Sequence, residues 1–221
     1  LVASGGHTNI FEVTRTSIET IARTRDDAMG ECFDKVGKRL GLDFPAGAEV
    51  DALAELGDAK RHPFKVPRCG DSLDLSYSGL KTQALVEIAK LEQAGVCVDL
   101  SKREDPSVRP AEEVLDLLAG FRKAAVGQLV DRLKRRNRQR PFSRLAVSGG
   151  AAANRLLRRE LSTWAERNDV TLDLVPLGYS GDNAAMIAWA ALLRFKAGDQ
   201  DDLFSTVAQS RLLLQGERPQ A

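Results

Sequence analysis

The chain has 221 residues, 43% of them hydrophobic and 29% charged, with a formal net charge of +1. This composition is typical of a folded globular protein and excludes collagen-like and disordered classes. The near-neutral charge confines any nucleic-acid contact to a local patch. No apolar run has the length of a transmembrane helix, no signal peptide is recognisable, and the three scattered cysteines lack metal-ligand spacing. We therefore expect a protein of the reducing cytoplasm with no membrane contact.

The first residues predict three strands in an antiparallel meander. An apolar stretch leads into Ser4-Gly5-Gly6, residues 9–14 continue as a second strand, and residues 17–25 alternate well enough for a third. Asp26 and Asp27 follow as candidate N-cap residues of a helix, because aspartate side chains accept hydrogen bonds from the first N–H groups of a helix.

The middle of the chain predicts helices. Met29, Phe33, Val36 and Leu40 form one apolar face of the first, and Gly41 ends it. A turn-rich link over 42–47 leads into a short helix that ends near residue 57, and residues 58–79 are irregular. A helix of about a dozen residues then begins within 75–82. A surface loop over 94–110 precedes the longest helix, over 111–136.

Two glycines lie inside this longest helix. Gly120 and Gly127 each cost roughly 1 kcal/mol relative to alanine. Close packing of a neighbouring segment at both positions would explain them.

The last part of the chain alternates strands and helices. Residues 144–147 predict a strand, 154–167 a helix, 171–175 a strand, and 183–196 a mostly apolar helix that we expect to be buried. An antiparallel meander followed by parallel crossover connections is the ribonuclease-H-like order, which occurs in each half of actin-like ATPase folds. We therefore predict an α/β domain over 1–214, with a helical insertion at about 42–110 and a loose tail over 215–221.

Two Ser-Gly-Gly turns follow predicted strands, at Ser4-Gly5-Gly6 and at Ser148-Gly149-Gly150. Glycine lets the backbone approach a ligand closely, and N–H groups at a helix start favour an anion such as phosphate. The pair suggests two loops that converge on one nucleotide-like ligand.

Four polar residues have alternative interpretations. Asp182 could bind a metal, ribose or phosphate-side group, or could simply cap its helix. Asp34 could face a ligand or form an exposed pair with Lys38. His7 lies in a candidate ligand loop, whereas His62 is interpreted as a surface loop residue.

Basic residues concentrate around the end of the longest predicted helix. They could bind a phosphate backbone, or could complement the helix dipole. These residues are Arg132, Lys134, Arg135, Arg136, Arg138, Arg140 and Arg144, with Arg155, Arg158 and Arg159 further on.

Six segments in one order closely resemble the tRNA N6-adenosine threonylcarbamoyltransferase family, whose older label is O-sialoglycoprotein endopeptidase or glycoprotease. The resemblance covers essentially the whole chain. The segments are Val2-Ala-Ser-Gly-Gly-His-Thr8, Asp26-Asp-Ala-Met-Gly-Glu-Cys-Phe-Asp-Lys35, Leu40-Gly-Leu-Asp-Phe-Pro-Ala-Gly47, Ser76-Tyr-Ser-Gly-Leu-Lys-Thr82, Ser148-Gly-Gly-Ala-Ala-Ala-Asn-Arg155 and Asp182-Asn-Ala-Ala-Met-Ile-Ala188.

The resemblance implies an actin-like fold and transfer of a threonylcarbamoyl group from threonylcarbamoyl-adenylate to N6 of the adenosine beside the anticodon, in tRNAs that read codons beginning with A. It also implies roles for individual residues. One divalent metal, usually iron as Fe(2+), would be bound by Asp182. The substrate would be contacted by Val2, Ala3, Ser4, Gly5 and Gly6, and its nucleotide part by Asp34, Gly47 and Asn154.

Two departures from the family pattern affect these expectations. The family's other metal ligands are a His-x-x-x-His pair upstream of the first Ser-Gly-Gly turn, which is absent here, and Gly181 and Ala184 replace the usual residues around Asp182. We therefore expect a C-terminal part of a longer protein whose N-terminal domain is absent. As it stands, the chain should bind metal poorly and transfer nothing.

The family implies tRNA as a partner, together with an actin-like paralogue and an ATPase subunit of a bacterial transfer complex. Two alternatives remain open. One is a non-catalytic actin-like scaffold in the same pathway. The other is a fragment of an actin-like ATPase or kinase.

Overall fold

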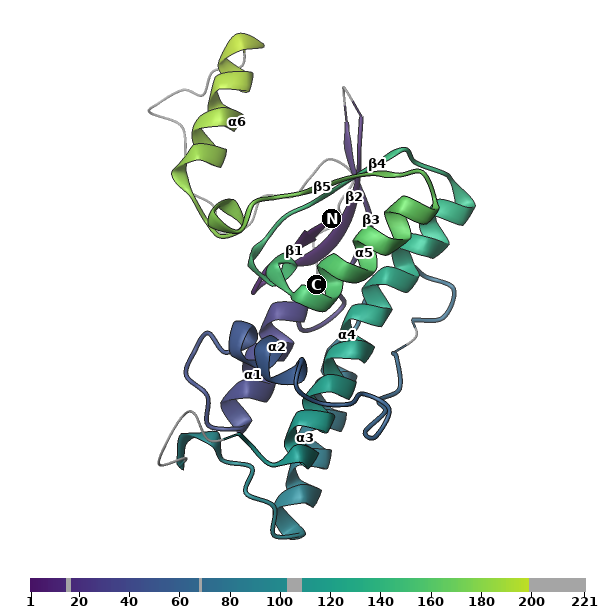
Figure 1. Cartoon of the computed structure of the whole chain (residues 1–221). Coiled ribbons are helices and arrows are strands. Elements are labelled where there is room, and N and C mark those ends of the chain that lie inside the picture. The colour runs from purple at the N-terminus through teal and green to yellow at the C-terminus, as the bar shows by residue number, and fades with distance from the viewer. Residues whose placement is uncertain (15–16, 68, 103–108, 199–221) are drawn as a thin grey trace.

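The structure is a computed structural model that describes residues 1–14, 17–67, 69–102 and 109–198. A small β-structure lies at one end of the molecule, and a group of helices extends from it around one long helix (Figure 1). Among the helices of the described residues, none combines the length and the hydrophobicity that a transmembrane span requires.

The predicted meander is confirmed. Strands β1 (Val2–Ala3), β2 (Thr8–Val13) and β3 (Ile18–Arg23) form an antiparallel sheet in this order. Its register pairs Val2 with Asn9 and Val13 with Ile18, and the register shifts between Ile10 and Phe11.

The parallel part of the sheet lies directly beside the meander. Strands β4 (Arg144–Val147) and β5 (Thr171–Leu174) pair in parallel. A parallel bridge joins Val2 to Ser148, and the Ala3 N–H donates to the Ser148 carbonyl oxygen at 2.8 Å. The strands therefore follow the spatial order β3-β2-β1-β4-β5, which is the ribonuclease-H-like order expected from the sequence.

Six α-helices and three short 3-10 helices occur within the described residues. The α-helices are α1 (Met29–Arg39), α2 (Gly47–Ala54), α3 (Ser78–Gln93), α4 (Glu112–Gln139), α5 (Arg155–Arg167) and α6 (Ala184–Lys196). The 3-10 helices are η1 (Leu100–Lys102), η2 (Gly150–Ala153) and η3 (Leu177–Tyr179).

Helix α4 is the centre of the helical core. It packs against α2, α3 and α5, and its buried side chains include Leu118, Phe121 and Leu129. The ring of Phe121 lies 4.9 Å from that of Phe33 on α1, centroid to centroid. The insertion between α1 and α4 is thus built into the core through α2 and α3.

The prediction that Asp26 and Asp27 cap α1 is wrong. Ala28 is the N-cap, and the Met29 N–H donates to Thr8 Oγ1 at 2.9 Å. The Asp26 carboxylate instead accepts hydrogen bonds at the start of α3, from the N–H groups of Tyr77 and Ser78. Asp27 forms ion pairs with Lys35 and Lys81.

The close packing predicted for the two glycines of α4 holds at one of them. A Cβ atom on Gly120 would lie 1.8 Å from the carbonyl oxygen of His62, so no side chain fits there. At Gly127 a Cβ would make an ordinary contact of 3.8 Å with Val66. His62 is also more than a surface loop residue, because its imidazole lies 3.5 Å from Glu87 and packs against Phe64.

The expected burial of the last helix is contradicted. Helix α6 forms where the sequence predicts it, but none of its residues is buried. It projects away from the rest of the protein, beyond the end of β5 (Figure 1). The predicted tail over 215–221 and part of the predicted loop over 94–110 lie outside the described residues.

Candidate functional site

The first Ser-Gly-Gly turn is the hairpin between β1 and β2. The Ser4 N–H donates to the His7 carbonyl oxygen at 2.7 Å, and the His7 N–H donates to Ser4 Oγ at 3.0 Å. A Cβ atom on Gly5 or Gly6 would have no neighbour within 4 Å. Both glycines therefore present bare backbone to open space, as a ligand-binding loop requires.

Helix α1 begins against this loop. The Glu31 N–H donates to the Gly5 carbonyl oxygen at 3.0 Å, and a Cβ on Gly30 would lie 2.7 Å from the carbonyl oxygen of Ser4. Because the loop itself occupies N–H groups of the first turn of α1, this helix start is not an anion site. It fixes the loop in place instead.

Asp34 lies one turn beyond Gly30 on α1 and reaches the start of α2. Its Oδ1 atom accepts a hydrogen bond from the Gly47 N–H at 2.9 Å. The carboxylate acts as an N-cap from a different helix, since α2 has no side-chain cap of its own. The alternative of an Asp34–Lys38 surface pair is not observed in the described part of the chain. The half-buried carboxylate of Asp34 lies beside the backbone of Gly47, which has no side chain to cover it.

Asp51 continues this line of contacts one turn further along α2. Its Oδ2 atom accepts a hydrogen bond from the Arg155 N–H, in the first turn of α5, at 3.0 Å. Its Oδ1 atom lies 3.0 Å from the guanidinium of Arg122 on α4. Both side chains are almost completely buried, so the ion pair fixes α2 between α4 and α5.

Arg122 has further partners on α2. Its guanidinium donates to the carbonyl oxygens of Asp51 and Ala54 and to the Glu55 carboxylate. Burial raises the pKa of Glu55, but hydrogen bonding and charge from Arg122 and Arg159 outweigh burial and hold the pKa below its usual value. Sequence reasoning missed this cluster. The sequence feature that could have indicated it is Arg122 itself, a charged residue next to Phe121 in a mostly apolar part of the helix.

The second Ser-Gly-Gly turn lies against the first strand. Gly149 has φ +98°, and a Cβ there would lie 2.3 Å from the carbonyl oxygen of Ala3. The turn continues into η2, after which Asn154 caps α5 by accepting a hydrogen bond from the Leu157 N–H at 2.9 Å. This use of the side-chain oxygen leaves the amide NH₂ group of Asn154 as its possible contact with a ligand.

These contacts form a closed ring of short-range links, which we call the cleft ring. It runs from the loop at 4–6 through Asp34, Gly47 and Asp51 to the start of α5, and returns through Gly149 to Ala3. All eight residues expected to contact the substrate lie on it or beside it, because Val2 and Ala3 form β1 and Asn154 precedes Arg155. The expected convergence of the two glycine loops is therefore present in the fold. Their ligand remains a prediction.

Asp182 lies apart from the cleft ring. It is exposed, and the N-cap of α6 is Asn183, which accepts a hydrogen bond from the Met186 N–H at 3.0 Å. The alternative in which Asp182 caps this helix is therefore wrong. Within the described residues, no hydrogen bond or ion pair joins Asp182 to the ring, and no group of three His, Cys, Asp or Glu side chains could hold a metal. The residues present do not fit a metal site by themselves.

Most of the basic residues around the end of α4 already have partners within the protein. Arg136 and Arg140 pair with Glu12, and Arg144 pairs with Asp173 at 2.7 Å. The guanidinium groups of Arg132 and Arg135 donate to carbonyl oxygens of the 67–74 segment. These contacts join loops to α4. The sequence suggested phosphate binding or an interaction with the helix dipole for these residues, and it did not suggest this structural role.

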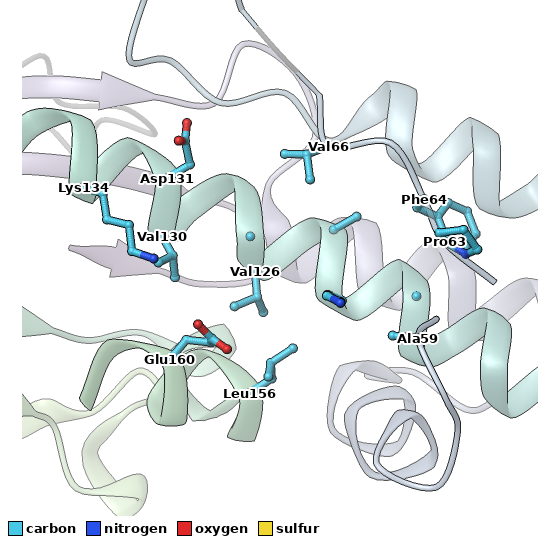
Figure 2. Close-up of a pocket in the computed structure, with 14 residues that line it drawn as sticks. Ala59, Pro63, Phe64, Val66, Val126, Val130, Asp131, Lys134, Leu156 and Glu160 are labelled. Atoms are coloured by element: carbon cyan, nitrogen blue, oxygen red, sulfur yellow. The ribbon is translucent and has the colours of Figure 1, made fainter. Parts of the chain in front are cut away.

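A groove of about 430 Å³ lies between α4, α5 and the 59–66 segment. Figure 2 shows Val126 and Val130 of α4 facing Leu156 and Glu160 of α5 across it, with the 59–66 segment on the other side. None of the eight expected substrate residues lines it. A candidate site based on this groove would therefore miss the glycine loops.

Comparison with known proteins connects this geometry to a family. The family model described as TsaD: tRNA N6-adenosine threonylcarbamoyltransferase matches residues 1–189. The enzyme of that name from Sorangium cellulosum (strain So ce56) is 40% identical over 210 residues, which cover 92% of this chain and 54% of that protein. Its namesake from Desulforapulum autotrophicum is 39% identical over 211 residues, covering 94% of this chain and 58% of that protein.

The chain thus spans little more than half the length of these curated relatives. Among solved structures, T. kodakarensis HypF aligns with a TM-score of 0.52 at 17% identity, over 82% of this chain and 21% of that one. This likeness supports the actin-like α/β fold alone. With a family match that extends from β1 into α6, the chain belongs to the tRNA N6-adenosine threonylcarbamoyltransferase family.

Proposed function

We propose that the cleft ring binds the adenylate part of threonylcarbamoyl-adenylate. The chain would then supply the nucleotide-binding wall of an enzyme that transfers the threonylcarbamoyl group to N6 of the adenosine beside the anticodon, in tRNAs that read codons beginning with A. The observation that carries this proposal is the ring itself, because it links two glycine loops and the carboxylates of Asp34 and Asp51 through direct contacts.

The chemistry of the ring suits an adenylate. An ionised carboxylate only accepts hydrogen bonds, so Asp34 suits the ribose hydroxyl groups and would repel the phosphate. The exposed backbone around Gly5 and Gly6 offers a place where a bulky phosphate can approach without meeting side chains. The amide NH₂ group of Asn154 can donate to an acceptor on the nucleotide.

The proposed reaction places little chemical demand on these residues. The N6 amine of the tRNA adenosine forms a bond to the carbamoyl carbon, and the amine loses a proton. The bond between that carbon and the phosphate oxygen breaks, and AMP leaves with the electron pair. The ring would hold the leaving nucleotide in one orientation, which lowers the entropy cost of the attack. We derive no step through a metal, because the described residues offer one isolated carboxylate, Asp182, for it.

The partners belong to the same proposal. A tRNA substrate would have to approach the carbamoyl end of the adenylate, and the paralogue and ATPase subunits of a bacterial transfer complex would act on the assembled enzyme. The same proposal places the protein in the cytoplasm, where it would meet its tRNA substrates.

Titration of the purified chain with AMP, followed by NMR or calorimetry, tests the proposal. We expect saturable binding that weakens at least tenfold in Asp34→Ala. Asp43→Ala is the matched control, since Asp43 is an exposed aspartate in the adjacent loop, and its affinity should stay within twofold. An absence of saturable binding at millimolar AMP would contradict the proposal and favour the non-catalytic scaffold. Hydrolysis of ATP without tRNA would favour the actin-like ATPase.

A further inference from the structure

Arg122 is a cation on α4 that is buried against α2. It is 5% exposed, and its guanidinium donates to the carbonyl oxygens of Asp51 at 3.1 Å and Ala54 at 3.2 Å. It also pairs with two carboxylates of the same region, with that of Asp51 at 3.0 Å and with that of Glu55, directly after the helix. One side chain therefore holds the C-terminal half of α2.

Both carboxylates also contact the first turn of α5. The Oδ2 atom of Asp51 accepts a hydrogen bond from the Arg155 N–H at 3.0 Å, and Glu55 lies 3.5 Å from the guanidinium of Arg159. The Arg155 N–H is among the first N–H groups of this helix, which have no partner inside the helix. Arg122 thus reaches the start of α5 through the two acids that it holds.

Asn154 lies immediately before this turn and is the N-cap of α5. It is only 7% exposed, and its Oδ1 atom accepts a hydrogen bond from the Leu157 N–H at 2.9 Å. The side chain can therefore offer its NH₂ group to a ligand, and the position of that group depends on where the first turn of α5 lies. A shift of the turn would move this donor away from the nucleotide.

We propose that Arg122 is a positioning residue for the adenylate, which it does not touch. It places the NH₂ group of Asn154 by fixing Asp51 and Glu55 between α4 and α5. This inference rests on the proposed function, because it requires the nucleotide to bind in the cleft ring. Without Arg122, the buried Asp51 carboxylate would lose its cation. A buried charge without a partner is unfavourable, so the carboxylate would turn towards water and away from the Arg155 N–H.

Arginine suits this role better than lysine. The guanidinium is a planar fork with five N–H donors, so it can contact two carboxylates and two carbonyl oxygens at once. An ammonium group is a compact point charge on a flexible stem, and it would not hold all four acceptors in one geometry. We therefore expect Arg122→Lys to keep the charge of the cluster but to position α5 less well.

Arg132 provides a matched control on the same helix. It is also buried, with 2% of its surface exposed, and its guanidinium donates to the carbonyl oxygens of Asp74 at 3.1 Å and Pro67 at 3.4 Å. Neither of these two residues forms a link of the cleft ring. Replacement of Arg132 should therefore lower stability without moving Asn154.

Calorimetric titration with AMP tests the inference on variants that circular dichroism shows to be folded. We expect Arg122→Met to weaken AMP binding at least tenfold and Arg122→Lys to weaken it at least threefold. The control Arg132→Met should stay within twofold of the unsubstituted chain. If Arg122→Met does not fold, Arg122→Lys supports the same comparison, because it retains a cation beside the two carboxylates.

Nuclear magnetic resonance separates positioning from general stability. In nitrogen-15-labelled protein without nucleotide, the side-chain NH₂ signals of Asn154 can be assigned with Asn154→Ala. They should shift in Arg122→Lys and remain unchanged in Arg132→Met. Asp51→Asn retains an oxygen for the Arg155 N–H but has no charge to hold, so in that background Arg122→Lys should shift the signals much less.

Four outcomes would overturn the inference. Unchanged AMP affinity in the Arg122 variants, or unchanged Asn154 signals, would do so and would leave the proposed function standing. An equal loss of affinity in Arg132→Met would mark a general effect of stability. An equal shift of the Asn154 signals in the Asp51→Asn background would show that Arg122 does not act through Asp51. Absence of AMP binding in the unsubstituted chain would instead refute the proposed function, and this inference with it.

Discussion

The carboxylate of Asp34 on α1 caps α2 from outside, through a hydrogen bond from the Gly47 N–H at 2.9 Å. One side chain therefore both stabilises a helix start and lies at the proposed nucleotide site. The sequence places the two residues in different segments, and only the packing of α1 on α2 brings them together.

The first prediction follows from this contact. Asp34→Ala removes the cap of α2 and should lower the free energy of unfolding by about 1 kcal/mol, as the loss of a helix cap does. Asp34→Asn keeps an oxygen acceptor and should cost less. Urea denaturation measures both, and Asp43→Ala should leave the midpoint unchanged. If Asp34→Ala left the free energy of unfolding unchanged, the Gly47 contact would not stabilise α2.

A second prediction concerns the ion pair of Asp51 and Arg122. Both residues are 5% exposed, so Arg122→Ala leaves a buried carboxylate without its cation. Removal of one partner of a buried pair costs about 3–5 kcal/mol. Arg138→Ala, at an exposed end of α4, should cost less than about 0.5 kcal/mol.

The double variant Asp51→Ala/Arg122→Ala separates pairing from packing. If the carboxylate is destabilising only when unpaired, the double variant should lose less stability than the sum of the two single variants. Additive losses in chemical denaturation would contradict the coupling.

The third prediction is a pH dependence at Asp26. Burial raises the pKa of this carboxyl, but hydrogen bonds from Ser76, Tyr77 and Ser78 outweigh burial and leave the pKa below its usual value. A depressed folded-state pKa stabilises the protein above the unfolded value of about 4, and this stabilisation is lost as the pH falls through the folded pKa.

Asp26→Asn should therefore reduce stability at pH 7 and flatten the fall in melting temperature below about pH 4. Thermal unfolding of both proteins from pH 7 to pH 2 provides the comparison. Parallel curves over the acid range would show that Asp26 contributes no pH-dependent stability.

The fourth prediction concerns metal. A catalytic metal normally needs about three protein ligands, and in the described residues Asp182 has no second or third partner for one. After anaerobic incubation with Fe(2+) and desalting, this chain should retain well below one equivalent, and Asp182→Ala should retain the same amount. Retention of a full equivalent that Asp182→Ala abolishes would refute the expectation.

Local patterns predicted the elements well, because hydrophobic spacing depends on neighbouring residues alone. They failed where a polar side chain acts at long range. Asp26 lies just before α1, but it caps α3 some fifty residues later, and no local rule distinguishes these two uses. The same holds for Arg122, whose partners on α2 lie about 70 positions earlier.

The candidate site was predictable to the extent that glycine loops and motif spacing mark it. The pattern could not show that Asn183 rather than Asp182 would cap α6, since both residue types are good caps at adjacent positions. Nor could it show that an apolar helix would be left uncovered, because burial depends on which polypeptide is present to cover it.

The construction of the cleft ring has a consequence for how substitutions should act on it. Two of its links, from Glu31 to Gly5 and from Ala3 to Ser148, join backbone atoms only. Two others depend on a side chain, through Asp34 and Asp51. In a saturation-mutagenesis map, the ring would therefore stand out as two intolerant acidic positions together with intolerant glycines at 30 and 149, where a Cβ would meet backbone atoms, with tolerant positions between them. The main chain defines the shape of the ring, and much of the surrounding sequence is free to drift.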